Sequence, residues 1–299
     1  MSLIVGGSVA LDTLETPHGR ADRVFGGSAS YFAYAASFLT KASLVGVIGH
    51  DFPDEYLKVL EGRGISLAGL ERSPKPTFSW HGKYHENMNN RDTLHVDLSI
   101  FEGWQVKVPS VLQNADTVCL ANMSPKQQLM LLQQCKNPRF VVADTMNLWI
   151  EIERDALFDV IRASHLFILN DEEARQLTEN DNLIVAGKSL LKRGPRYVVV
   201  KKGEHGALLI AKEGTYSIGA YPLEKVFDPT GAGDCFAGGL AGYLDKTGDL
   251  SFKGVKEALL AGTTAASFCV EDFSFHRLRK LTDQEFNARL AALRTHVTL

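Results

Sequence analysis

The sequence predicts an α/β protein in three layers, with a central, mostly parallel β-sheet between two layers of helices. Three observations lead to this fold class. Short apolar runs rich in β-branched residues recur along the chain. Segments with apolar residues at spacings of three and four, typical of amphipathic helices, separate these runs. The chain has 299 residues, 45% of them hydrophobic, which is enough to bury both faces of a large sheet.

The strands and helices of this fold can be assigned in chain order. The apolar runs predict strands at residues 3–9, 42–48, 117–120, 140–143, 166–169, 197–201 and 207–210. The helical spacings predict helices at residues 27–39, 53–63, 125–135, 153–163, 181–192, 233–246, 252–269 and 282–294. Because strands and helices alternate, we expect most neighbouring strands to run parallel.

Two polar segments, residues 12–25 and 75–97, interrupt this alternation. They contain histidine and aromatic residues but little helical periodicity, and their short strand-like runs predict a small antiparallel sheet built from both segments. We expect this sheet to act as a lid on a single domain spanning residues 1–299, because no linker or repeat divides the chain. The edges of such a sheet favour a homodimer formed through the lids.

Composition excludes several classes of protein. The 32 basic and 35 acidic residues give a formal net charge of -3, whereas a nucleic-acid partner requires a basic face. Neither a secretory signal nor a run of about 20 apolar residues is present, so we expect no membrane partner and a cytoplasmic location. The four cysteines are widely separated without a CxxC pair, which predicts reduced thiols.

The most informative segment is residues 228–239, Asp-Pro-Thr-Gly-Ala-Gly-Asp-Cys-Phe-Ala-Gly-Gly. Apolar residues at helical spacing follow Asp234, so Gly231, Ala232 and Gly233 form a loop that leads into a helix N-terminus. Backbone amides there can approach an anion closely. Asp234 would lie beside that anion, where a carboxylate can take a proton from a hydroxyl that attacks a phosphoryl group. The structural alternative is an N-cap with glycines for tight packing.

This segment closely resembles the C-terminal signature of the ribokinase family, also called the PfkB carbohydrate kinases. Gly26 and Gly27, which open an alanine-rich helix, are similar to the family's N-terminal Gly-Gly motif. Residues 6–12 resemble its first strand with a substrate-binding aspartate. Residues 170–173 and 201–206 match its Asn-x-x-Glu and Lys-x-Gly-x-x-Gly motifs. Because the motifs occur in family order, the resemblance covers essentially the whole chain.

The resemblance implies a ribokinase-like kinase that transfers the γ-phosphate of ATP to a hydroxyl of a sugar, a nucleoside or a related small molecule. Asp234 would be the catalytic base, and the amides of Gly231, Ala232 and Gly233 the anion hole. The residues implied to hold the acceptor are Asp12, Gly26, Gly27 and Tyr31. The residues implied to border the nucleotide are Asn170, Lys201, Gly203, Gly206 and Thr263, and Glu173 would order Mg²⁺.

The sequence also departs from the family pattern. Tyr31 stands where many members have an asparagine that touches substrate hydroxyls, so specificity for ribose or fructose does not follow from the resemblance. Residues 271–275 replace the family's common Gly-Ala loop. The resemblance therefore does not extend securely to the monovalent cation that some members bind beside Asp228.

Other interpretations of the same residues remain open. Residues 170–173 also suit a helix start, with an asparagine cap and acids in the first turn, and Gly203 with Gly206 suits a hairpin turn. A catalytically idle sensor of nucleotides or metabolites would use the same fold, although Asp234 and the loop glycines favour an enzyme. Residues 182–189 lack the first glycine of a P-loop. No dinucleotide-binding glycine pattern supports an oxidoreductase.

Overall fold

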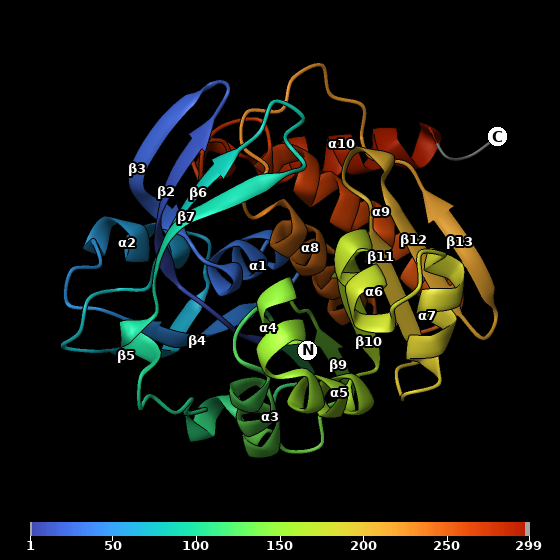
Figure 1. Ribbon diagram of the computed structural model, residues 1–299, viewed down its shortest axis with the longest axis horizontal. Coiled ribbons are helices and arrows are strands. Elements are labelled where there is room, and N and C mark those ends of the chain that lie inside the picture. Colours follow the sequence, from blue (N-terminus) through green and yellow to red (C-terminus); the bar gives the residue numbers. More distant parts are fainter. Residues whose placement is uncertain (1, 297–299) are drawn as a thin grey trace.

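The computed structural model describes residues 2–296, so the ends of the expected domain, residue 1 and residues 297–299, lie outside the described part. Its main sheet consists of β1 (Leu3–Gly6), β4 (Ala42–Ile48), β5 (Ser66–Arg72), β8 (Thr117–Leu120), β9 (Phe140–Ala143), β10 (Leu166–Asn170), β11 (Tyr197–Lys201), β12 (Ala207–Ala211) and β13 (Gly214–Ile218). The strand order is β13-β12-β11-β10-β9-β8-β1-β4-β5 (Figure 1). All pairs from β5 to β11 are parallel, whereas β12 and β13 extend the sheet antiparallel. The predicted mostly parallel sheet is confirmed.

Helices cover both faces of this sheet. One face packs against α1 (Ser28–Ala36), α2 (Asp54–Gly62), α8 (Ala232–Thr247), α9 (Phe252–Cys269) and α10 (Asp283–His296). The other packs against α3 (Pro125–Gln134), α4 (Asn147–Ile152), α5 (Arg154–Ala163), α6 (Asp171–Thr178) and α7 (Leu183–Leu191). Successive strand residues alternate between the two cores, with Leu3 and Val5 in one and Ile4 in the other. The result is the expected three-layer arrangement.

The structure corrects several element boundaries. The strand expected over residues 3–9 ends at Gly6. β5 and β13 were not predicted, because both are edge strands whose partly exposed residues do not form a continuous apolar run. The helix α4 was missed because six residues give too little periodicity, whereas the start of α6 agrees with the helix start considered for residues 170–173. Residues 183–191 form α7, which confirms that the P-loop-like residues there are helical.

A second, four-stranded sheet contains β2 (Ala10–Thr16), β3 (Gly19–Gly26), β6 (Ser79–Tyr84) and β7 (Arg91–Asp97), in the order β3-β2-β6-β7. Figure 1 shows it at the upper left, above α2 and β4. Both polar segments contribute a hairpin, as predicted. The expectation of an antiparallel sheet was wrong, because the hairpins meet through β2 and β6, which run parallel.

Two further expectations concern the cysteines and helices long enough to span a membrane. All four cysteines are free thiols, and Cys119, Cys235 and Cys269 are buried. Among residues 2–296, no helix has the length and apolar character needed to cross a bilayer.

Candidate active site

The glycine-rich loop leads directly into α8, which begins at Ala232, one residue before the predicted start. Gly231 precedes it with φ +78°, a left-handed conformation that favours glycine. A Cβ on Gly231 would lie 2.4 Å from the ring of Tyr31. Both the backbone angle and the close approach therefore require glycine at this position.

The three amides of the loop do not face the same surroundings. The Ala232 amide donates to the carbonyl oxygen of Pro229 at 3.1 Å. In the described part of the chain, the backbone amides of Gly231 and Gly233 donate no hydrogen bond. These two amides are thus better placed than that of Ala232 to receive an anion at the positive end of α8.

Asp234 lies in the first turn of α8 and is partly accessible to solvent. Burial of its carboxylate, together with the nearby charge of Asp144, raises the pKa of Asp234 to about 7, while Lys201 and Arg91 act in the opposite direction. A carboxylate with a pKa near neutrality is suited to accept a proton and later release it.

Lys201, at the end of β11, connects the loop to the main sheet. Its Nζ lies 3.2 Å from Oδ2 of the buried Asp144 and 2.9 Å from where a Cβ would stand on Gly233. Although burial opposes its charge, the neighbouring carboxylates of Asp144, Glu173 and Asp234 raise the pKa of Lys201. A fixed cation therefore lies between the loop and these acids.

Asn170 and Glu173 form the capping box of α6. Oδ1 of Asn170 accepts from the Glu173 amide, and Oε2 of Glu173 accepts from the Asn170 amide, both at 2.7 Å. The structural interpretation of this motif is therefore correct, yet it leaves Glu173 close to Lys201. Burial raises the pKa of Glu173 to about 7, against the opposing charge of Lys201.

Asp12 does not end a strand of the main sheet, as its position in the sequence indicated, but lies within β2 of the small sheet. It is only 5% exposed, and a Cβ on Gly26 would overlap its Oδ2. Within residues 2–296, its Oδ1 has no hydrogen-bond partner. Burial, with Asp228 nearby, raises the pKa of Asp12 to about 8. An unpartnered buried carboxylate oxygen is a candidate acceptor for a ligand hydroxyl.

Tyr31 and Asp228 lie beneath the glycine-rich loop. Tyr31 is 1% exposed, its hydroxyl has no partner, and its ring stacks on Phe275 with 4.4 Å between centroids. The two carboxylate oxygens of Asp228 accept the amides of Thr230 at 2.9 Å and Ser274 at 3.0 Å. Through Asp228, these hydrogen bonds connect residues 271–275, the segment that departs from the family pattern, to the glycine-rich loop.

Two contacts of the small sheet with the main domain lie close to the candidate site. The Tyr84 hydroxyl and Oγ1 of Thr230 are 3.0 Å apart. At the tip of the β6–β7 hairpin, Nδ2 of Asn89 donates to Oε2 of Glu204 at 2.8 Å. Glu204 belongs to the short 3-10 turn Gly203–His205 that joins β11 to β12, the hairpin alternative considered for Gly203 and Gly206. The small sheet thus reaches both the glycine-rich loop and this turn.

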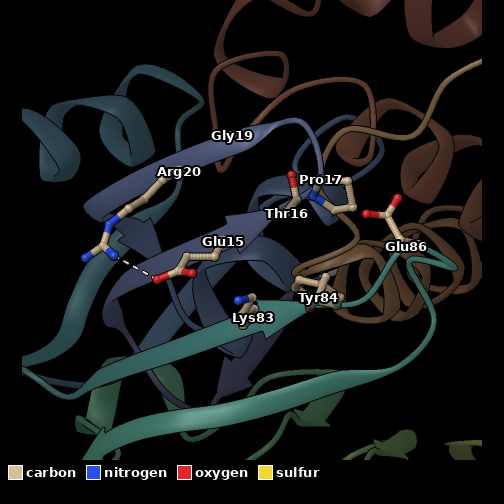
Figure 2. A pocket seen from close by; sticks show the side chains of 8 residues that line it. All are labelled: Glu15, Thr16, Pro17, Gly19, Arg20, Lys83, Tyr84 and Glu86. Atoms are coloured by element: carbon tan, nitrogen blue, oxygen red, sulfur yellow. Dashed lines mark hydrogen bonds and ion pairs between the residues drawn. The ribbon is translucent and has the colours of Figure 1, made fainter.

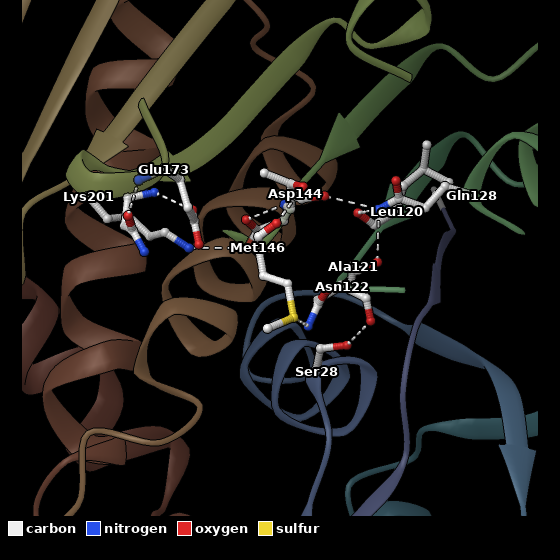
Figure 3. A network of polar contacts seen from close by, with 11 residues as sticks. Ser28, Leu120, Ala121, Asn122, Gln128, Asp144, Met146, Glu173 and Lys201 are labelled. Atoms are coloured by element: carbon white, nitrogen blue, oxygen red, sulfur yellow. Dashed lines mark hydrogen bonds and ion pairs between the residues drawn. The ribbon is translucent and has the colours of Figure 1, made fainter. Parts of the chain in front are cut away.

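A polar network follows the carboxyl ends of the parallel strands (Figure 3). The Ser28 hydroxyl donates to the Asn122 carbonyl at 2.9 Å, and Nδ2 of Asn122 contacts the Met146 sulfur at 3.1 Å. Nε2 of Gln128 bonds the carbonyl of Asp144 and those of residues 120 and 121. The network connects the start of α1, beside Gly27, with the Lys201–Asp144 pair.

Figure 2 shows a hollow of about 240 Å³ at one end of the small sheet. It contains charges of both signs, and Glu15 is already paired with Arg20 at 2.7 Å. Its lining residues are Glu15, Thr16, Pro17, Gly19, Arg20, Lys83, Tyr84 and Glu86. None of the expected site residues lines this hollow.

Most expected site residues converge, but the sequence interpretation missed others. Asp144 directly follows the buried strand β9, and a carboxylate after a parallel strand could have identified it. Arg91 and Asn89 act from the small sheet, where the sequence carried no signal for these two residues. Thr263 is a buried residue of α9, and no hydrogen bond within residues 2–296 joins it to the Gly203–Gly206 turn.

Comparison with known proteins agrees with this geometry. The family model described as pfkB family carbohydrate kinase matches residues 13–276. A cytidine kinase of Thermococcus kodakarensis is 31% identical over 250 residues, which are 81% of this chain and 88% of that protein. A nucleoside kinase of Methanocaldococcus jannaschii is 24% identical and covers 84% of this chain and 80% of its own.

Solved structures show the same fold. The nucleoside kinase of Methanocaldococcus jannaschii superposes with a TM-score of 0.78 at 20% identity, covering 97% of this chain and 98% of that one. A nucleoside kinase of Burkholderia thailandensis in complex with inosine gives 0.77 at 20% identity, covering 97% and 96%. At this identity the likeness establishes the fold alone.

Proposed function

Because the chain belongs to the pfkB family of carbohydrate kinases, which are ATP-dependent phosphotransferases acting on hydroxyl groups, we propose that its acceptor is a hydroxyl on the sugar ring of a nucleoside. The names of the cytidine and nucleoside kinases among its relatives support this acceptor class. Free sugars are the second candidate, since a ribokinase of Mus musculus is 29% identical over 81% of this chain.

The observation that favours a nucleoside is an aromatic surface on the small sheet. Trp80, Gly82 and Tyr84 alternate along β6 and so share one face. Tyr84 on that face contacts Thr230 of the glycine-rich loop. The indole of Trp80 lies over Gly82, so close that a Cβ on Gly82 would overlap the ring. A flat indole on the face that meets the loop can stack against a base, whereas a free sugar offers it no aromatic partner.

The proposed reaction starts with the acceptor hydroxyl between Asp12 and Asp234. Asp12, with Gly26 and Gly27, would hold the sugar hydroxyls, because its Oδ1 has no protein partner. Asp234 takes the proton of the attacking hydroxyl, whose oxygen forms a bond to the γ-phosphorus while the bond to ADP breaks. The amides of Gly231 and Gly233, with Lys201, would stabilise the developing charge. Tyr31 would support this loop from below.

The residues near Lys201 fit a magnesium ion. Three carboxylates, those of Asp144, Glu173 and Asp234, act on the charge of one lysine, and burial, together with the charge of Asp144, raises the pKa values of Glu173 and Asp234. Mg²⁺ is typically held by one or two carboxylates and the phosphates of the substrate. We propose that Glu173 and Asn170 hold it through the capping box, where it would neutralise phosphate charge. Gly203, Gly206 and Thr263 are proposed to border the nucleotide.

A monovalent cation fits less well. The carboxylate of Asp228 already accepts two backbone amides, one of them from Ser274 in the replaced loop. These hydrogen bonds stabilise the carboxylate and occupy both of its oxygens, although burial still raises the pKa of Asp228. We therefore propose that the enzyme works without a monovalent cation.

The small sheet is also the proposed dimer surface. Its edge strand β7 exposes the apolar side chains of Leu94, to 51%, and Val96, to 42%. A second copy of this chain would cover part of this apolar surface and pair the open edge. Light scattering at micromolar concentration should give a dimer for the wild type and a monomer for Leu94→Ser with Val96→Ser. A wild-type monomer would contradict this assignment.

The function is tested by measuring ATP consumption and product mass with nucleosides, free ribose, deoxyribose and other sugars. We expect cytidine or another nucleoside to give the highest kcat/KM, and Trp80→Ala to raise KM for the nucleoside but not for ribose. Asp234→Ala should lower kcat by about 10²–10⁴ with nucleotide binding retained. A higher kcat/KM for a free sugar would replace the acceptor assignment, and ATP binding without turnover on any acceptor would favour an idle sensor.

A further inference from the structure

A basic hollow lies away from the glycine-rich loop, between α1, α2 and the short 3-10 helix Leu278–Lys280. Its volume is about 480 Å³, within the range of small-molecule sites. The hollow is lined by Tyr34, Lys58, Val59, Gly62, Arg63, Arg279 and Lys280. Every charged side chain in this lining is basic, in a chain whose formal net charge is -3.

Most of this positive charge is uncompensated. Arg63 pairs with Asp283 at 2.9 Å and donates to the Ser37 carbonyl. Within residues 2–296, no ion pair or side-chain hydrogen bond engages Lys58, Arg279 or Lys280. Like charges gathered at one hollow repel one another and create a positive potential that an anion would relieve.

The Tyr34 hydroxyl adds a neutral donor to the hollow. Tyr34 is 2% exposed overall, and within residues 2–296 its hydroxyl makes no hydrogen bond, whereas its backbone carbonyl accepts one from the Ser37 hydroxyl. Burial raises its pKa, so it stays protonated and can donate. Guanidinium, ammonium and phenol donors around one hollow match the oxygens of a phosphate group.

We propose that this hollow binds a phosphate-bearing metabolite with at least two negative charges, at a site separate from the proposed catalytic centre. The residues that would hold it are Lys58, Arg63, Arg279 and Lys280, with Tyr34 as a neutral donor.

Packed contacts lead from the hollow to the catalytic loop. The amide of Arg279 donates to the Phe275 carbonyl at 2.9 Å. The ring of Phe275 lies edge-on to Tyr34 at 5.4 Å and stacks on Tyr31 beneath Gly231. The residue before it, Ser274, donates its amide to Asp228. An anion that orders Arg279 would therefore also restrain the segment that supports the glycine-rich loop.

The test uses inorganic pyrophosphate at constant ionic strength, with binding followed by calorimetry and by backbone hydrogen exchange. Because the glycine-rich loop is a second anion site, we expect two classes of binding in the wild type and slower exchange in residues 271–281. The variant Lys58→Gln with Lys280→Gln removes two side chains that have no structural partner. It should lose one class, with affinity at the hollow falling at least about tenfold.

The matched control is Lys107→Gln with Lys136→Gln, which removes the same charge from two exposed lysines elsewhere. It should bind like the wild type. Equal binding by all three proteins, or slower exchange at the glycine-rich loop alone, would overturn the proposal. If adding an equal charge of simple salt abolishes the binding of pyrophosphate, the hollow holds an adventitious ion only. None of these measurements needs turnover, so they succeed or fail independently of the proposed reaction.

Discussion

The Nζ of Lys201 lies 3.2 Å from Oδ2 of Asp144 and directly beside the Cα of Gly233, where a Cβ would come too close to it. This lysine is the last residue of β11, and this aspartate directly follows β9; the two strands flank β10 in the sheet. Their opposite charges both act on Asp234, Asp144 raising its pKa and Lys201 lowering it. Burial is the main cause of the raised pKa of Asp234, and the two members of the ion pair adjust this pKa in opposite directions.

Opposite shifts of the pH profile should follow from removing either partner. The pKa of Asp234 is about 7, and its carboxylate must be ionised to accept a proton, so kcat/KM should fall as the pH drops below about 7. Lys201→Ala should move this acid limb to higher pH, and Asp144→Asn should move it to lower pH. Shifts in the same direction would show that the limb belongs to another group.

The stability of the nucleotide-free protein should decrease as pH rises toward 8. Asp12 has a folded-state pKa of about 8 against an ordinary 3.8, so the folded state keeps its proton where the unfolded chain has lost it. Its contribution to stability is complete below about pH 4 and disappears as pH rises through 8. Asp12→Asn stays neutral and should flatten the decline of Tm between pH 7 and 8. The exposed Asp22→Asn serves as control and should keep the wild-type slope.

The contact between Asn89 and Glu204 should couple the small sheet to the nucleotide. Loss of this hydrogen bond in Asn89→Ala should raise KM for ATP by about fivefold and increase ATP hydrolysis without acceptor, because water enters a looser site. Glu204→Ala should have the same effect, and the double variant no more than either single one. Glu86→Ala, in the same hairpin, is the control. Additive effects would mean that the two residues act separately.

The amides that satisfy Asp228 predict little dependence on monovalent cations. Rates measured in potassium chloride and in tetramethylammonium chloride at equal ionic strength should agree within about twofold, because both carboxylate oxygens of Asp228 already accept backbone amides. A tenfold activation by potassium would show that the Asp228 loop rearranges to admit one.

Much of the site could be predicted because its residues belong to contiguous motifs. Gly231 and Asp234 are three residues apart, so the helix start alone places them together. The same local logic identified α7 and excluded a P-loop. Asp12 was recognised as a site residue, but its place was misjudged, because only the pairing of β2 with β3 and β6 reveals that it lies in the small sheet.

The sequence by itself determined the α/β class, the two polar segments and the loop that begins α8, because strand and helix periodicity and glycine chemistry are local properties. Only the tertiary structure decided which charges meet at Asp234. Lys201, Asp144 and Arg91 come from three distant segments, and their positions depend on strand order and on the way the second hairpin folds over the sheet. The basic hollow has the same origin, since its lysines and arginines are gathered from residues 58–63 and 279–280 by packing alone.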